Sequence, residues 1–441
     1  MKKEYPRLLV SNKRGRIFCH PELEATGMAA GHFFRIYPEK LIELPGGSIL
    51  FMTPNRAPIG YDRAKDNFTI LNDKYLAVAA FISPGYAVTN SVSYREAARS
   101  KALPLFSYAA ASFYKGRIFV SALRVDRGLR HDSRFINMAL VRKNIARFRR
   151  IFPDNALVRH LERCALSYGC CGAQNFFLSK HECPLPASPF CNARCAGCIS
   201  HQERNMCSAS QPRIRFIPDP EEISEIALFH IANVKDAVVS FGQGCEGEGL
   251  LVSDTIEKSI RLIRQKTSKG IINMNTNASS PGALAGLFDA GLDSIRVSLN
   301  SAQELYYARY YRPLNYAFQD VLKSIKLARR KNRFVSINYL TMPGFTDWEE
   351  EFSAFKKFIE NYGVDMIQWR NLNFDPLLYF KELKVRVARD KLIGIGQVIN
   401  SLKESFPNLM MGCFNPSKRK MSRGGNFSAS TLLAMRPGGF A

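Results

Sequence analysis

The alternation of apolar and polar positions divides the chain into two parts. From residue 1 to about 120, short apolar runs are separated by turn signals rich in Gly, Pro and Asn, and helical periodicity is weak. After about residue 181, apolar runs alternate with longer segments in which apolar positions recur with the helical period. The first pattern predicts a β-rich unit, and the second predicts βα repeats that assemble a parallel sheet.

The βα repeats can be followed one by one along the second part. The predicted strands are 237–241, 270–274, 294–299, 333–340 and 365–372, and the predicted helices are 220–231, 255–265, 281–290, 316–331 and 347–361. With a further strand ahead of residue 191, they predict an α/β fold in which six parallel strands form a partial (βα)6 barrel. We expect four regions, which are a β-rich accessory domain at 1–120, a basic helical linker at 121–180, the barrel at 181–385, and a C-terminal helix with a flexible basic tail at 386–441.

The net charge of +24 on 441 residues adds an indication of an anionic partner. Arg residues are concentrated between 124 and 163 on an amphipathic segment, and further basic runs occur at Lys326–Arg333 and Lys418–Arg423. A solvated basic helix face explains this pattern, and so does a contact with the phosphate backbone of RNA.

Two absences and the cysteine usage indicate the compartment. No run of about eighteen apolar residues occurs, so no membrane-spanning helix is expected. The first residues lack the apolar segment of a secretory signal. The 11 cysteines include a clustered triplet typical of a metal site, which favours a reducing environment over a disulfide framework. We therefore predict a cytoplasmic protein with no membrane partner.

The triplet is Cys191, Cys195 and Cys198, spaced CxxxCxxC within one predicted loop. Thiolates suit zinc or iron–sulfur clusters, and structural zinc sites take four protein ligands. The chain has no second CxxC to complete a zinc site, so the spacing favours a 4Fe–4S cluster in which one iron keeps an open position. The remaining cysteines near residues 164–245 allow an auxiliary cluster, although burial as small apolar side chains is the simpler interpretation.

Polar residues follow the predicted strands at their carboxyl ends, where ligands collect in α/β barrels. The residues of this kind are Gly247, Glu248 and Gly249 after the second strand, Asn275 and Asn277 after the third, Ser298 on the fourth, Asn338 on the fifth and Gln368 on the sixth. Glycines permit close approach to a ligand, and a carboxylate suits an ammonium group. These positions predict a binding site that faces the cysteine loop.

The cysteine spacing and the strand-end motifs together resemble the radical S-adenosylmethionine (radical SAM) superfamily. The resemblance implies that a 4Fe–4S cluster is ligated by Cys191, Cys195 and Cys198, and that S-adenosyl-L-methionine (SAM) is bound at its open iron. In that family, the reduced cluster cleaves SAM to a 5′-deoxyadenosyl radical. Gly247 and Glu248 resemble the element that holds the SAM amino group, and Asn275, Asn277, Ser298 and Asn338 stand where further SAM contacts are expected. A reductant such as ferredoxin or flavodoxin is implied as a partner.

This chain departs from the family pattern at two positions. Gly249 stands where Pro is usual, and Glu246 is a possible substitute for Glu248. Gly197 stands where an aromatic residue often lies against adenine, so other residues must line that side of the pocket. The tyrosines between 306 and 311 are interpreted as packing residues, with a contact to substrate as the alternative.

The sequence leaves the substrate open. RNA stands slightly ahead of a protein or peptide because of the charge, although the first domain shows no aromatic RNA-binding motif. A rival hypothesis is a non-catalytic, metal-stabilised nucleic-acid-binding protein. It explains the charge and leaves the order of the strand-end motifs unexplained.

Overall fold

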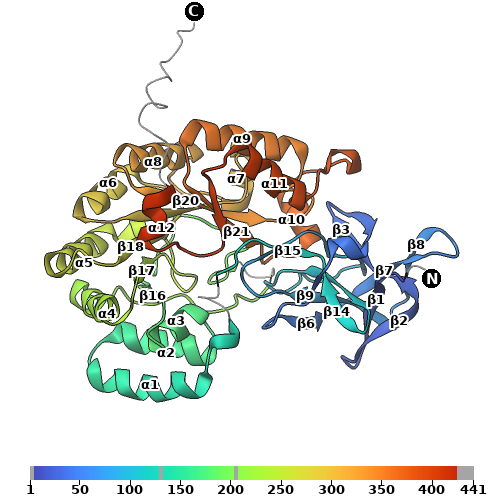
Figure 1. Ribbon diagram of the computed structural model, residues 1–441, viewed down its shortest axis with the longest axis horizontal. Coiled ribbons are helices and arrows are strands. Elements are labelled where there is room, and N and C mark those ends of the chain that lie inside the picture. The colour runs from blue at the N-terminus through green and yellow to red at the C-terminus, as the bar shows by residue number, and fades with distance from the viewer. Residues whose placement is uncertain (1–3, 129–132, 203–206, 425–441) are drawn as a thin grey trace, which may run out of the picture.

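The computed structural model describes residues 4–128, 133–202 and 207–424. These residues form a β-rich part and a half-barrel that lie side by side, with three helices packed beside the start of the half-barrel (Figure 1). The fold class predicted from the sequence is therefore confirmed.

A parallel seven-stranded sheet is the core of the half-barrel. Its spatial order follows the chain: β16 (Glu182–Pro184), β17 (Val238–Phe241), β18 (Ile271–Thr276), β19 (Ser294–Leu299), β20 (Phe334–Thr341), β21 (Met366–Asn371) and β22 (Met410–Gly412). The first six are the strands expected from the sequence. The short strand β22 is an addition, paired in parallel with β21.

Helices cover the outer face of this sheet (Figure 1). They are α4 (Pro220–Asn233), α5 (Ser253–Lys266), α6 (Pro281–Ala290), α7 (Glu304–Tyr311), α8 (Phe318–Arg330), α9 (Glu349–Tyr362), α10 (Pro376–Leu383) and α11 (Ile395–Ser405). Local signals place their ends. In α6, the Ser280 side chain accepts from the Ala283 N–H, Pro281 opens the first turn, and Gly291 ends the helix with a φ of +118°.

The β-rich part is a nearly closed antiparallel sheet of 13 strands. The strands of its main path are β12 (Tyr94–Glu96), β7 (Arg56–Asp62), β2 (Ile17–Glu24), β1 (Arg7–Asn12), β9 (Tyr75–Phe81), β13 (Ala109–Tyr114), β11 (Ser91–Val92), β3 (Thr26–Ala29) and β4 (His32–Arg35). The side strands are β5 (Ile42–Glu43), β6 (Ile49–Met52), β8 (Asn67–Ile70) and β14 (Arg117–Val120), and β10 (Tyr86–Val88) pairs separately with β15 (Ala122–Arg124). Strand β9 is buried on both faces, because Val78 and Ala80 pack into one apolar cluster and Ala77 and Ala79 into another.

Three helices connect the two parts: α1 (Met138–Ile151), α2 (Ala156–Ser167) and α3 (Cys171–Phe177). Helix α1 carries the predicted amphipathic pattern, with Val141, Ile145 and Phe148 buried against its neighbours. Its arginines lie on the opposite, exposed face.

A buried ion pair joins the β-rich part to the barrel. Arg56 on β7 and Asp375 in the loop after β21 are each 1% exposed, and Arg56 Nη2 lies 3.1 Å from Asp375 Oδ2. The Asp375 carboxylate also accepts from the Tyr94 hydroxyl at 2.9 Å and from the Leu103 N–H at 3.1 Å. A second link uses Asn371, whose side chain accepts from the Val88 N–H at 2.9 Å. The last long strand of the barrel is thus fixed to the β-rich part at two places.

The C-terminal segment differs from the prediction of a flexible tail from about residue 414. Asn415 is buried, and its amide group bonds to Glu182, Ser240 and Gln368 from three barrel strands. Residues Lys418–Gly424 form helix α12, and the rest of the predicted tail lies outside the described residues. The prediction was wrong because it considered apolar burial alone, whereas this segment is fixed by polar bonds inside the barrel.

No helix in the described ranges is long and apolar enough to cross a membrane.

Candidate functional site

The cysteine loop is held along both of its edges by backbone hydrogen bonds. On one edge, the N–H groups of Arg194 and Ala196 donate to the carbonyls of Tyr311 and Tyr310 at the end of α7, at 3.0 and 2.9 Å. On the other edge, the N–H of Gly247 donates to Ser188 O and the N–H of Glu248 to Phe190 O, both at 2.7 Å. The thiols are therefore presented from a loop whose backbone is fixed before any ligand binds.

Gly247 has a steric reason to be glycine. A Cβ atom built on it would lie 1.8 Å from the carbonyl oxygen of Phe190. Only a residue without a side chain permits this close approach of the glycine-rich loop to the segment that leads into Cys191.

All three thiols are half-buried, and burial raises the pKa of two of them. Burial raises the pKa of Cys191 to about 11, and the negative charge of Glu248 raises it as well. Burial and the neighbouring thiols raise the pKa of Cys195 well above its usual value. Since metals bind thiolates, a metal centre here must displace protons.

The distances between the three sulfur atoms distinguish a site for an iron–sulfur cluster from a site for a single metal ion. A zinc ion with Zn–S bonds of about 2.3 Å brings its thiolates to within about 4.6 Å of one another. Among the described residues, the His/Cys/Asp/Glu groups whose ligand atoms all lie within 4.8 Å do not include Cys191, Cys195 and Cys198 together. A 4Fe–4S cluster, which places each cysteine on a different iron, therefore fits these residues better than a mononuclear zinc site.

Glu248 and Glu246 are both buried, and their carboxylates are already hydrogen-bonded. Glu248 accepts from the Thr276 hydroxyl at 2.6 Å and from the Asn277 N–H at 2.7 Å, which ties the glycine-rich loop to the end of β18. Glu246 accepts from the N–H groups of Ala187 and Ser188 at 2.8 and 3.0 Å. Burial raises the pKa of Glu246 to about 7, against the backbone N–H groups that lower it. Both carboxylates thus position the loop, and a contact of Glu248 with SAM stays a prediction.

Asn275, near the end of β18, and Asn277, just after it, also join the loops. The Asn275 amide donates to Gly242 O at 2.9 Å. The Asn277 amide donates at 2.7 Å to the side chain of Asn192, the residue that follows Cys191. The structure brings Asn277 to the cysteine loop, as the strand-end argument expects, and places Asn275 against the glycine-rich loop.

A cavity of about 530 Å³ opens beside Cys195 and Cys198 at the carboxyl ends of the strands. Ser298 and Asn338 line it, and they are register partners on β19 and β20. Three of its lining residues carry buried polar atoms that have no hydrogen-bond partner in the described part of the chain: Arg296 Nε, Tyr311 Oη and Asn338 Oδ1. Such atoms are expected where a polar ligand completes the hydrogen bonding.

Two arginines of this cavity, Arg296 and Arg370, were not among the predicted site residues. Burial lowers the pKa of Arg296 to about 10, and the charge of Arg370 lowers it as well. The signal for Arg296 was in the sequence, because Arg296 and Ser298 alternate with apolar residues and so share one face of β19. The predicted Gln368 accepts from Arg296 Nη1 at 2.9 Å and belongs to the barrel interior.

The place beside Gly197 is filled by other residues. A Cβ on Gly197 would lie 2.7 Å from the Tyr310 hydroxyl and 3.4 Å from a ring carbon of Phe374. Tyr307, Tyr310 and Tyr311 are buried, which agrees with their interpretation as packing residues. Tyr310 and Tyr311 also line the cavity, and a contact of these residues with substrate stays a prediction.

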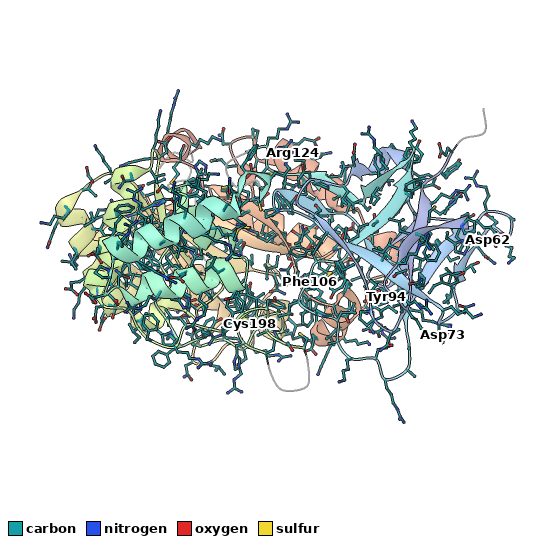
Figure 2. All side chains as sticks on the ribbon, turned by 90° about the horizontal axis from the view of Figure 1, so that it is seen from below. Asp62, Asp73, Tyr94, Phe106, Arg124 and Cys198 are labelled. Carbon is teal, nitrogen blue, oxygen red and sulfur yellow. The ribbon has the colours of Figure 1, made fainter. Side chains whose placement is uncertain are left out.

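One cation contacts a thiol of the loop directly. Arg213 Nη2 lies 3.7 Å from Cys198 Sγ, and its Nε donates to Ser200 Oγ at 3.3 Å. Figure 2 shows Cys198 near the middle of the molecule, between the barrel helices and the β-rich part that contains Tyr94.

Comparison with known solved structures found weak similarities. Streptococcus suis SuiB bound to S-adenosylmethionine is 15% identical, with 59% of this chain and 60% of that chain covered and a TM-score of 0.36. The coproporphyrinogen III oxidase HemN from Escherichia coli is 14% identical, with 52% of each chain covered and a TM-score of 0.32. For SuiB bound to its precursor peptide SuiA, this chain covers 50% of that chain. A search of curated proteins gave no match.

The comparison with family models gave a match to the Radical SAM superfamily over residues 185–355. The matched segment begins at the end of β16, contains the three cysteines and the glycine-rich loop, and extends into α9. Residues 185–355 therefore form a domain of the Radical SAM superfamily.

Proposed function

We propose that this protein is a radical SAM enzyme that binds a 4Fe–4S cluster through Cys191, Cys195 and Cys198 and SAM in the adjoining cavity. The observation that carries the proposal is the position of Cys195 and Cys198 on a cavity of about 530 Å³ where one buried polar atom each of Arg296, Asn338 and Tyr311 has no partner among the described residues. The rival hypothesis of a metal-stabilised nucleic-acid-binding protein offers no reason for this cavity.

The chain's own residues hold and orient the two groups. When bound, the reduced cluster supplies the electron that cleaves SAM to methionine and a 5′-deoxyadenosyl radical. Gly247 and Gln243 bring backbone polar groups of the glycine-rich loop close to the cysteine loop, while Glu246 and Glu248 fix that loop from behind. Ser298 and Asn338 face the cavity with the short polar side chains that ribose hydroxyls require.

The same cavity indicates the chemistry of the substrate. Arg296, Arg370 and Glu182 all line the cavity, and, besides burial, the charge of Arg370 lowers the pKa of Arg296 while that of Glu182 raises it. The two guanidinium groups outnumber this carboxylate, which favours an anionic group in the substrate. A volume of about 530 Å³ is in the range of small-molecule sites, of about 300–1,000 Å³. We therefore propose a small substrate with a carboxylate or phosphate group.

The basic run Lys326–Arg333 gives no support to RNA, which the net charge had put slightly ahead. The run at 326–333 lies on α8 and the turn after it, at the amino ends of the strands, opposite the cavity. There Arg329 pairs with Asp365, Lys331 pairs with Asp289, and Arg333 donates to Phe288 O. These cations are engaged within the barrel wall and do not form a path to the cysteine loop.

The enzyme proposal is tested with anaerobically reconstituted protein reduced by dithionite. We expect release of 5′-deoxyadenosine from SAM by the wild-type protein and none by Cys195→Ala. Cys19→Ala, on β2 of the β-rich part, is the matched control and keeps the activity. A wild-type protein that holds its iron and cleaves no SAM with any reductant would contradict the proposal.

The substrate proposal is tested in the same assay with fractions of a cell extract. The low-molecular-weight fraction should accelerate 5′-deoxyadenosine formation, and Arg370→Gln should reduce this acceleration at least tenfold while leaving the cleavage of SAM alone unchanged. Acceleration by the RNA fraction only would refute a small substrate.

A further inference from the structure

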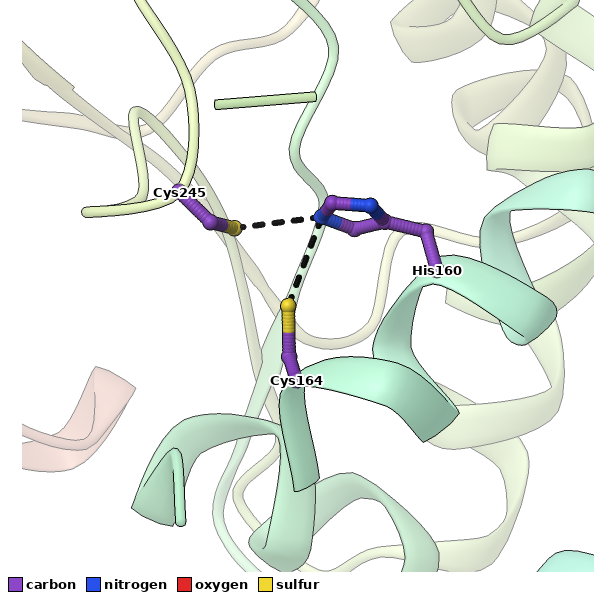
Figure 3. Close-up of side chains that lie close together, drawn as sticks. All are labelled: His160, Cys164 and Cys245. Carbon is purple, nitrogen blue, oxygen red and sulfur yellow. Dashed lines mark hydrogen bonds between the residues drawn. The ribbon is translucent and has the colours of Figure 1, made fainter. Parts of the chain in front are cut away.

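Three side chains that the radical SAM chemistry does not use converge at one point behind the glycine-rich loop. His160 and Cys164 lie four residues apart on α2, so they share one face of that helix. Cys245 reaches them from the loop after β17 (Figure 3). Their ligand atoms all lie within 4.8 Å of one another, and Cys164 and Cys245 are both buried.

The distances fit a tetrahedral metal ion. His160 Nε2 lies 3.4 Å from Cys164 Sγ and 3.4 Å from Cys245 Sγ. With Zn–S bonds of about 2.3 Å and a Zn–N bond of about 2.0 Å, a tetrahedral angle places the nitrogen about 3.5 Å from each sulfur. The two observed distances therefore leave room for one ion at the centre of the group.

Hydrogen bonding alone accounts poorly for this arrangement. A neutral imidazole nitrogen either donates one proton or accepts one, so Nε2 forms one good hydrogen bond. Here two thiols approach the same nitrogen at equal distances. Two thiolates and a neutral imidazole around one divalent cation satisfy all three atoms at once.

The surrounding structure holds the group in place without that ion. The Cys245 carbonyl accepts from the Ile214 N–H at 2.7 Å, and the ring of Phe216 packs edge-on against His160. Cys170 lies between α2 and α3, where its N–H donates to the Cys164 carbonyl at 3.0 Å. Its thiol is not part of the group of ligand atoms within 4.8 Å, so the three side chains leave the fourth coordination position to a water molecule.

We propose that His160, Cys164 and Cys245 bind one zinc ion, at a second metal site separate from the cysteine triplet. Cys245 is followed by Glu246, whose carboxylate bonds to Ala187 and Ser188 ahead of Cys191. The ion therefore anchors the glycine-rich loop to α2, and through Glu246 it supports the cysteine loop. We assign the ion a structural role, because its ligands join a helix to a loop and none of the three lines the cavity beside Cys195 and Cys198.

The test measures metal content in a variant that cannot hold the iron–sulfur cluster. In C191A/C195A/C198A, elemental analysis after dialysis should find one zinc per chain. Adding C164S or C245S to this variant should lower zinc at least tenfold, whereas adding C19S should leave it unchanged. This result does not depend on the proposed enzyme activity, so failure of one proposal is distinguishable from failure of the other.

A measurement on the wild-type protein covers the case in which a variant does not fold. X-ray absorption at the zinc edge should show two sulfur neighbours at least and one imidazole nitrogen. A strong chelator that removes the zinc should accelerate amide exchange in residues 242–248 while the far-ultraviolet dichroism is kept. Wild-type protein without zinc, zinc that survives C164S, iron with acid-labile sulfide at this site, or a Cys164–Cys245 disulfide in freshly prepared protein would each overturn the proposal.

Discussion

The buried pair between Arg56 and Asp375 allows a quantitative test of how the β-rich part is held against the barrel. The Asp375 carboxylate accepts three hydrogen bonds from the β-rich part, from Arg56, Tyr94 and Leu103. Two more come from the first turn of α10, from the N–H groups of Leu377 and Leu378. Both charges are removed from water, so Asp375 depends on Arg56 for compensation, whereas Arg56 is also paired with Glu96 at 3.0 Å.

The magnitude follows from these contacts. Arg56→Met leaves the Asp375 charge buried, and the loss of one partner of such a pair lowers the free energy of unfolding by about 3–5 kcal/mol. Asp375→Asn should cost a similar amount, because its amide nitrogen must face donors that the carboxylate oxygen accepted. The double variant should cost little more than either single variant, with a coupling energy of about 3 kcal/mol.

Native-state hydrogen exchange measures this cost locally. The amide protons of Leu103 and Val88 are suitable, because each donates across the contact between the two parts. A loss of about 3 kcal/mol corresponds to exchange faster by about a hundredfold or more. Arg117→Gln, which breaks an exposed pair with Glu43, is the control and should leave both protons protected. Additive effects of the two single variants, or exchange that hardly changes, would refute the reasoning.

Three further predictions concern the loops and the core. Gly247→Ala should abolish cluster retention because of its contact with Phe190 O, whereas Gly282→Ala, whose Cβ would meet no atom within 4 Å, should keep the iron content of the wild type. Arg213→Gln removes a charged donor to the Cys198 sulfur, a contact worth about 1.5 kcal/mol. The midpoint potential of the proposed cluster should therefore become about 60 mV more negative in a redox titration. An unchanged or raised potential would count against that contact. Burial lowers the pKa of His230 to about 4, below its value of about 6.5 in the unfolded chain. The stability that depends on neutral His230 is therefore fully present above pH 6.5 and is lost as the pH falls toward 4. Over that interval the unfolding free energy of the wild type should fall by about 3 kcal/mol relative to His230→Gln, and parallel pH curves would show that His230 is not responsible.

The barrel could be predicted from the sequence because its signals are local. Helix α6 and strand β19 have the predicted ends, since a cap residue and a proline mark the first and a run of apolar residues marks the second. The β-rich part was predicted as a class only. Strand β7 was missed, because Arg56 at its start is polar and its burial depends on Asp375, more than 300 residues away.

In the candidate site, too, residues with a local sequence signal could be predicted, and contacts between distant segments could not. The cysteines and the strand-end residues were found because each belongs to a short motif. The roles of Glu246 and Glu248 as supports of the loops, the convergence of His160 with Cys245, and the placement of Arg370 in the cavity depend on distant segments that no local pattern relates. Asn415 is the clearest case, since a polar residue in a basic segment is buried by bonds to three separate strands.

The distribution of the cavity lining along the chain has a consequence for biosynthesis. Its walls come from Pro84 in the β-rich part, from the cysteine loop, and from Phe414, which follows β22. A ribosome completes the three cysteines more than two hundred residues before it reaches Phe414. During that interval the nascent chain exposes its thiols in a half-barrel that still lacks one wall. The proposed iron–sulfur cluster can therefore enter the completed cavity only after nearly all of the described chain has been synthesised, and until then the thiols depend on reducing surroundings.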